Sequence, residues 1–199
     1  KSFIKSKTPE YYDDSIILQI YNKSNDSKKA GEGTGESIAK ELKTSSNILK
    51  LNKKKDWRKK LDNNWIMNSD EILEINGKYW NSVQHYLYAF RFSNIPEIYD
   101  LFVKGSENIA SKTVEDAKIF YDKMLKDKTY KSKIKSEEVY KKEYSEALTR
   151  GLMAKFSINE YKEILLLTDN ALIYVYKHRS PREKADKLMK IRLVLAKKL

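Results

Sequence analysis

The chain has 199 residues, of which 40% are hydrophobic, so it is long enough for one well-covered domain and too short for two comfortable ones. Its 40 Lys and Arg against 28 Asp and Glu give a formal net charge of +12, which favours polyanionic partners: nucleic acid, a phosphate-bearing ligand or an anionic surface. The absence of cysteine excludes disulfides, thiolate nucleophiles and cysteine-based zinc sites, and it fits a reducing compartment.

Hydropathy argues against a membrane or secreted protein. No run of about 18 apolar residues occurs, and the N-terminal residues lack the apolar stretch of a signal peptide. We therefore expect no membrane partner, no secretion and an intracellular location.

The first 55 residues are predicted to form an N-terminal extension, with the main domain over residues 56–199. Residues 15–21, SIILQIY, are rich in β-branched side chains and predict a strand. Residues 22–37, NKSNDSKKAGEGTGES, have the composition of a mobile connector.

Three glycines in this connector, Gly31, Gly33 and Gly35, resemble a phosphate-binding loop. Such a loop ends in Lys-Ser/Thr or opens directly into a helix after a strand. Here the sequence GEGTGE would put acidic residues where phosphate oxygens would lie. A linker is the favoured interpretation.

A dense basic run follows in residues 49–65. Its cations could track a phosphate backbone, with Trp57 available for stacking on a base. They are Lys53, Lys54, Lys55, Arg58, Lys59 and Lys60. The alternative is a solvated basic face, in which Trp57 and Leu61, four residues apart on a helix, pack inward.

The strongest local signal is EILEINGKYW, residues 71–80. Asn76-Gly77 between alternating segments predicts a type I′ hairpin, because both turn residues then need positive φ and this pair tolerates it. A helix should follow at once, capped by Asn81 or Ser82.

The spacing within this helix separates two stripes. The stripe predicted to lie in the core contains Val83, Leu87 and Phe90. The stripe expected to face a groove or water contains Gln84, Tyr88 and Arg91.

The remainder is predicted to be mostly helical. Helical spacing occurs in residues 96–105, 113–125, 139–156 and 159–168, with a basic loop over 126–138. Residues 171–176 predict a strand, and residues 181–198 a terminal helix begun by Pro181.

Ordinary catalytic templates are missing. The two histidines, His85 and His178, belong to no HExxH pattern, and there is no GxSxG motif. We predict no metal site and no cofactor. The residues alone therefore indicate a basic, mostly helical domain with a polar groove edge.

Five motifs in order resemble the NADAR or YbiA-like family: DWRKKLDNNW, NGKYWNSVQHYLYAFRF, MAKFSINE, LLLTDNA and LMKIR, across residues 56–195. The upstream IYNKSND and GEGTGE segments resemble the extended versions found in giant DNA viruses. The resemblance implies an α+β, predominantly helical domain with a small antiparallel β-hairpin or sheet. It also implies an N-glycosidase that acts on ADP-ribosyl or phosphoribosyl N-glycosides, including ADP-ribose on nucleobases.

Departures from the family pattern concern its chemistry. Gln84 stands where the family has Glu, and an amide cannot transfer a proton. Other departures are Asn64 in place of an aromatic residue, Tyr140 in place of Trp, and Val175 in place of a polar residue. The scaffold positions that match are Lys155, Phe156, Leu188, Met189 and Arg192.

Retained scaffold and altered chemistry suggest a degenerate member that binds an ADP-ribose-type or nucleotide ligand, with weak or absent hydrolysis. The predicted groove residues are Asn63, Trp80, Gln84, His85 and Tyr88, with Arg91 on the ligand phosphate. Structural roles are the alternatives: a turn residue at Asn63, hairpin core at Trp80, a backbone-bonded His85 and a surface Tyr88.

A different class of function also fits the charge. In this alternative, a basic structural or nucleic-acid-associated viral protein has repurposed the fold. It would bind DNA or RNA in a virion or in a replication complex of the host cell. Salt dependence separates the two, because polyanion binding weakens steeply with ionic strength.

Overall fold

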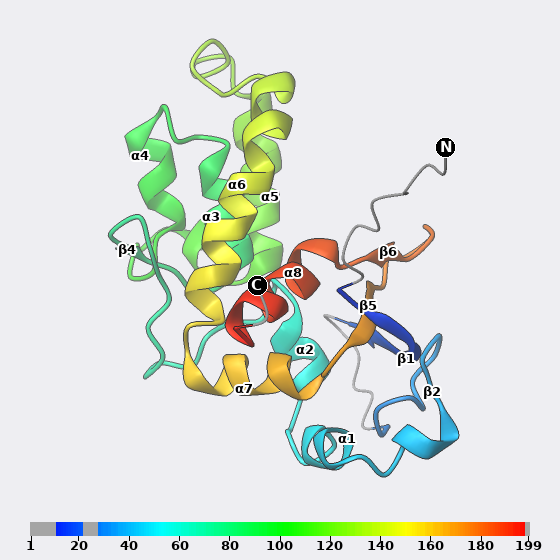
Figure 1. The fold of residues 1–199 in the computed structure, drawn as a ribbon. Coiled ribbons are helices and arrows are strands. Elements are labelled where there is room, and N and C mark those ends of the chain that lie inside the picture. The colour runs from blue at the N-terminus through cyan, green and yellow to red at the C-terminus, as the bar shows by residue number, and fades with distance from the viewer. Residues whose placement is uncertain (1–10, 22–27, 198–199) are drawn as a thin grey trace, which may run out of the picture. The chain divides into compact units, whose positions relative to one another are not determined.

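The computed structural model describes residues 11–21 and 28–197, which fall into two compact units (Figure 1). One unit combines the described residues up to Arg58 with those from Glu163 onward, and the other is Lys59–Lys162. The division falls within α2 (Trp57–Leu61) and α7 (Asn159–Leu167). The predicted domain boundary after residue 55 stays a prediction.

The first unit contains a four-stranded sheet in the order β2-β1-β5-β6. Its strands are β1 (Asp13–Ile20), β2 (Ser37–Ile38), β5 (Ala171–Val175) and β6 (Glu183–Lys184). Both predicted strands are confirmed. The sheet is mixed rather than purely antiparallel, because β1 and β5 run parallel while β2 and β6 are antiparallel to their neighbours.

Short helices accompany this sheet: η1 (Lys40–Leu42), α1 (Ser46–Leu51) and α8 (Asp186–Leu195). The prediction that the last helix begins at Pro181 is wrong. Residues 183–184 extend the sheet as β6 instead, and α8 begins two residues later. Arg192 of α8 is buried and donates to Thr168 Oγ1 at 2.9 Å and to Ala171 O at 2.8 Å, which fits its predicted scaffold role.

The second unit is mostly helical, and α3 packs against α5 and α6 in it. Its helices are α3 (Val83–Phe90), α4 (Pro96–Tyr99), η2 (Asp100–Phe102), η3 (Ile109–Ser111), α5 (Val114–Lys126) and α6 (Glu137–Lys155), followed by the start of α7. The helices predicted over 113–125, 139–156 and 159–168 and the loop before α6 are confirmed to within two residues, whereas the segment predicted as a helix over 96–105 forms the shorter α4 and η2 and ends at Phe102. Thr113 and Ser136 cap α5 and α6 by accepting backbone N–H groups, which explains where these helices begin.

A hairpin of β3 (Glu74–Ile75) and β4 (Lys78–Tyr79) leads into α3. Asn76 and Gly77 both have positive φ, 55° and 71°, between the paired residues Ile75 and Lys78, which confirms the two-residue turn. Ser82 is the cap of α3, since its hydroxyl accepts the His85 N–H.

The core stripe of α3 is confirmed, because Val83, Leu87 and Phe90 are all buried. Gly151 of α6 lies opposite: a Cβ there would come within 2.8 Å of a Val83 methyl, so the absent side chain permits this close helix packing. The second stripe differs from expectation at one end. Gln84 and Tyr88 are half-buried, but the Arg91 side chain is only 8% exposed.

Across the described residues, no helix combines the length and apolar character needed to cross a bilayer.

Candidate functional site

The loop after α2, residues 62–65, connects several of the predicted site residues within the second unit. Asp62 shapes the turn, since its Oδ1 accepts the Asn64 N–H at 2.7 Å. The Gln84 backbone N–H donates to the Asn63 carbonyl oxygen at 3.0 Å. The first turn of α3 and the loop are therefore fixed to each other, and two motif positions 21 residues apart in sequence become neighbours.

Lys155, at the end of α6, holds the same loop from inside. Its side chain is wholly buried, and Nζ donates to the Asp62 carbonyl oxygen at 2.6 Å. Burial lowers the pKa of Lys155 to about 7, against the opposing influence of the Asp62 and Glu71 carboxylates. Burial also raises the pKa of Asp62. Near neutral pH Lys155 is thus partly an uncharged amine, a form that can act as a base or a nucleophile.

A hydrogen-bonded chain of side chains lies beside this lysine. Trp65 Nε1 donates to the Tyr161 hydroxyl at 2.8 Å, and that hydroxyl donates to a Glu71 carboxylate oxygen. The Lys155 Nζ lies 5.4 Å from the centre of the Tyr161 ring. Burial and the contact with Glu71 raise the pKa of Tyr161, so it remains a neutral donor. This chain fixes Trp65 and Glu71 on either side of Tyr161.

Gln84 lies one helical turn before Tyr88, whose ring centre is 5.0 Å from that of Tyr121. Burial, with a smaller effect of Asp122, raises the pKa of Tyr88 to about 12. Gln84 is positioned by its backbone, through the hydrogen bond to Asn63 O. An amide there can bind a hydroxyl or a water but cannot exchange a proton.

Three other predicted ligand residues have partners inside the protein. Trp80 is wholly buried in the hairpin core, with Nε1 donating to Ile75 O at 3.1 Å. His85 is buried with Nδ1 2.8 Å from Ser82 Oγ, and burial lowers its pKa to about 4. Arg91 forms an ion pair with Glu137 at 2.9 Å, so its guanidinium is engaged within the protein rather than available to a ligand phosphate. The ligand roles of all three residues stay predictions. Trp80 lies in the hairpin core, as the structural alternative for this residue predicts.

The backbone arrangement that carries these residues has a counterpart among solved structures. The NMR structure of the E. coli protein YbiA matches over 96% of this chain and 89% of that chain, with a TM-score of 0.52 and 14% sequence identity. The chain has a YbiA-like fold. At that identity the likeness concerns the fold alone. No family model and no curated protein matches the sequence.

The basic run of this YbiA-like chain does not form one free cationic face. Trp57 and Leu61 are buried, as the structural alternative predicts, so Trp57 is not available for stacking on a base. Lys54 pairs with Glu163 at 2.6 Å, and Lys60 pairs with Glu160. The exposed members of the run are Lys53 and Lys55. Nucleic-acid binding through this run stays a prediction.

The glycine-rich segment is hydrogen-bonded to its surroundings. Residues 28–36 form a loop, and residues 22–27 of the predicted connector lie outside the described residues. The Glu36 carboxylate accepts the backbone N–H groups of Gln19 at 2.9 Å and Gly33 at 3.0 Å, and it pairs with Arg58. Backbone N–H groups of the kind that a phosphate loop offers to a ligand are thus bound by the protein's own carboxylate.

Sequence reasoning undervalued Lys155, which it assigned to the scaffold. The available signal was its spacing, since Lys155 follows Gly151 by four residues and Leu152 by three and so lies on the buried face of α6. No group of three or more acidic or histidine side chains suited to a metal ion occurs within residues 11–21 and 28–197.

Proposed function

We propose that this chain is a NADAR-like domain that binds an ADP-ribose-type or nucleotide ligand where the 62–65 loop meets the start of α3. The observation that carries the proposal is the hydrogen bond from Gln84 N to Asn63 O, formed within a YbiA-like fold. It unites two positions that the family resemblance assigns to the ligand site. Ribose hydroxyls are suitable partners for the amides of both residues.

Hydrolysis of N-glycosides should be weak or absent in this domain. The position that holds Glu in the family pattern is Gln84, whose amide cannot transfer a proton. Removing a general acid or base typically lowers the rate by about 10² to 10⁴. The buried amine of Lys155 supports the loop through Asp62 O, so we assign it a positioning role.

Calorimetry and kinetics on two proteins test this function. Wild-type protein and Gln84→Glu are each titrated with ADP-ribose and assayed for cleavage of ADP-ribosylated guanosine. We expect both to bind ADP-ribose and Gln84→Glu to raise the cleavage rate at least about 10-fold, the lower part of an acid–base contribution. Asn94→Asp, which adds the same charge on an exposed loop, should leave the rate unchanged.

Two results would contradict the proposal. If neither protein binds ADP-ribose, Gln84 is a structural residue of the helix start. Rapid cleavage by the wild-type protein would show that the chemistry does not depend on an acid at this position.

A further inference from the structure

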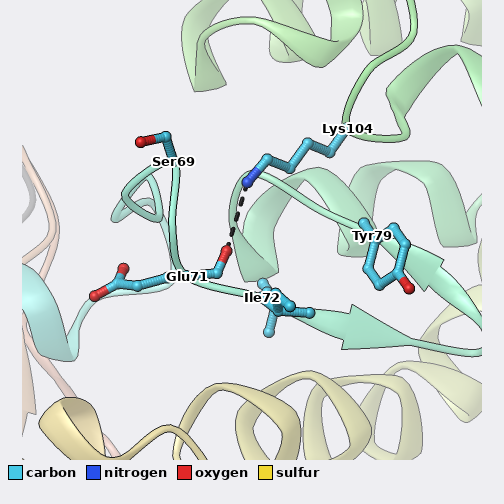
Figure 2. A pocket seen from close by; sticks show the side chains of 6 residues that line it. Ser69, Glu71, Ile72, Tyr79 and Lys104 are labelled. Carbon is cyan, nitrogen blue, oxygen red and sulfur yellow. Dashed lines mark hydrogen bonds between the residues drawn. The ribbon is translucent and has the colours of Figure 1, made fainter.

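A pocket of about 410 Å³ lies beside the hairpin in the second unit (Figure 2). It is lined by Ser69, Glu71, Ile72, Leu73, Tyr79 and Lys104. The volume falls within the range of about 300 to 1,000 Å³ typical of small-molecule sites. None of these residues belongs to the 62–65 loop or to α3, although Glu71 connects to Trp65 of that loop through the Tyr161 hydroxyl.

The walls of this pocket expose apolar and aromatic surface. Ile72 is 67% exposed and Tyr79 is 52% exposed, whereas Leu73 beside them is buried. A flat ring system would cover both exposed side chains and remove apolar area from water. The pocket therefore suits a ligand with an apolar or aromatic body.

Lys104 gives the pocket one positive charge. Its backbone N–H donates to Tyr79 O at 2.8 Å, which fixes the residue on the edge of β4. Its Nζ makes a long hydrogen bond of 3.5 Å to the Glu71 carbonyl oxygen, and no carboxylate of the described residues pairs with it. An ammonium group with only a distant neutral acceptor can take an anionic group of a ligand.

The one acidic lining residue does not oppose such a ligand. Figure 2 shows the Glu71 carboxylate directed away from the Lys104 ammonium, while the Glu71 carbonyl faces it. That carboxylate accepts the Tyr161 hydroxyl and the Asn68 N–H, the latter at 2.9 Å. Its negative charge is thus directed to the opposite side of the 69–72 segment.

We propose that this pocket binds a small ligand in which an aromatic ring carries a single carboxylate or phosphate group. The ring lies against Ile72 and Tyr79, and the anion binds Lys104. Aromatic carboxylates and mononucleotides share this chemistry, and the experiment distinguishes them.

The test is an NMR titration of the whole chain with indole-3-acetate and with adenosine 5′-monophosphate, each beside its neutral counterpart, indole-3-acetamide or adenosine. We expect at least one anionic probe to shift the backbone amides of Ile72, Tyr79 and Lys104, and its neutral counterpart to bind about 10-fold more weakly, the effect of a charge-assisted hydrogen bond. Tighter binding of indole-3-acetate would indicate an aromatic carboxylate as the ligand, and tighter binding of adenosine 5′-monophosphate would indicate a mononucleotide.

Substitutions locate the site. Lys104→Met should weaken binding of the anionic probe about 10-fold, and Lys104→Arg should retain it. Lys123→Met removes the same charge from the exposed face of α5 and should change nothing. Equal binding by Lys104→Met, equal binding of the neutral counterpart, or unshifted amides with both anionic probes would each overturn the proposal. ADP-ribose binding at the 62–65 loop should be unaffected by Lys104→Met, so the two proposals can fail independently.

Discussion

Two buried cations, Arg58 in one unit and Lys155 in the other, are held in different ways. The Arg58 side chain is 5% exposed, and it pairs with a Glu36 side chain that is 0% exposed. It also donates to the carbonyl oxygens of Lys28 and Lys29. Lys155 is more deeply buried, yet its one hydrogen bond in the described part of the chain goes to the neutral carbonyl of Asp62.

The chemistry of the two side chains explains the difference. A guanidinium cannot lose its proton in a protein, so a buried arginine needs several acceptors, and for Arg58 a carboxylate is among them. An amine can lose its proton, and burial lowers the pKa of Lys155 to about 7. Arg58 therefore fixes the glycine-rich loop, whereas Lys155 places a group of variable charge next to the candidate ligand site.

The largest effect is expected from breaking the pair at Arg58. Glu36→Ala should lower the free energy of unfolding by about 3 to 5 kcal/mol, because it leaves a buried charge without its partner. Glu32→Ala, on an exposed residue of the same loop, should stay within about 0.5 kcal/mol of wild type. Urea denaturation measures both. Equal losses in the two variants would mean that Arg58 does not depend on Glu36.

Lys155 should make stability depend on pH in the alkaline range. Its pKa is about 7 in the folded protein against an ordinary value of 10.5, so between these pH values the folded state binds fewer protons than the unfolded state. Stability should therefore rise with pH in this window, by up to about 1.4 kcal/mol per pH unit.

Denaturation of wild type and Lys155→Met between pH 7.5 and 9.5 checks this slope, which the variant should lack. Lys126→Met, on an exposed residue of α5, should keep the wild-type slope. A slope that survives in Lys155→Met would show that Lys155 is not its source.

His85 should make stability depend on pH in the acid range, over a narrower range of pH than Lys155. Burial lowers its pKa from an ordinary 6.5 to about 4, so the unfolded state binds more protons between these values. Stability should fall as the pH drops from 6.5 to 4, with this group contributing up to about 1.4 kcal/mol per pH unit. His85→Asn should remove that contribution and His178→Asn should not, as thermal unfolding at several pH values will show. Identical profiles for the two variants would contradict the prediction.

The smallest effect concerns nucleic acid. Because Arg58 and Lys60 are engaged inside the protein, phosphate contacts should come from Lys53 and Lys55. Their joint replacement by Ser should flatten the dependence of log K on log salt for duplex DNA by about 2, given a slope near 0.9 per phosphate. Fluorescence anisotropy at several salt concentrations measures this slope. An unchanged slope would identify the run as solvated surface.

The sequence by itself determined the local features of this protein. The Asn76-Gly77 turn, the Ser82 cap and the buried stripe at Val83, Leu87 and Phe90 follow from rules that act within one or two turns of chain. The inward packing of Trp57 and Leu61 was available as an alternative on the same grounds. Resemblance to a known motif order also named Asn63 and Gln84, although their mutual contact was not visible in it.

Only the tertiary structure decided the features whose partners lie far apart in the chain. Arg58 meets Glu36 across 22 residues, and Lys155 meets Asp62 across 93, so no local pattern identifies the partner of either cation. The same applies to Arg91, which is buried and pairs with Glu137 on α6, and to residues 183–184, which join β5 as a strand. Local spacing determines which face of a helix is apolar, but long-range packing determines which polar groups are enclosed, because desolvation depends on everything that surrounds a group.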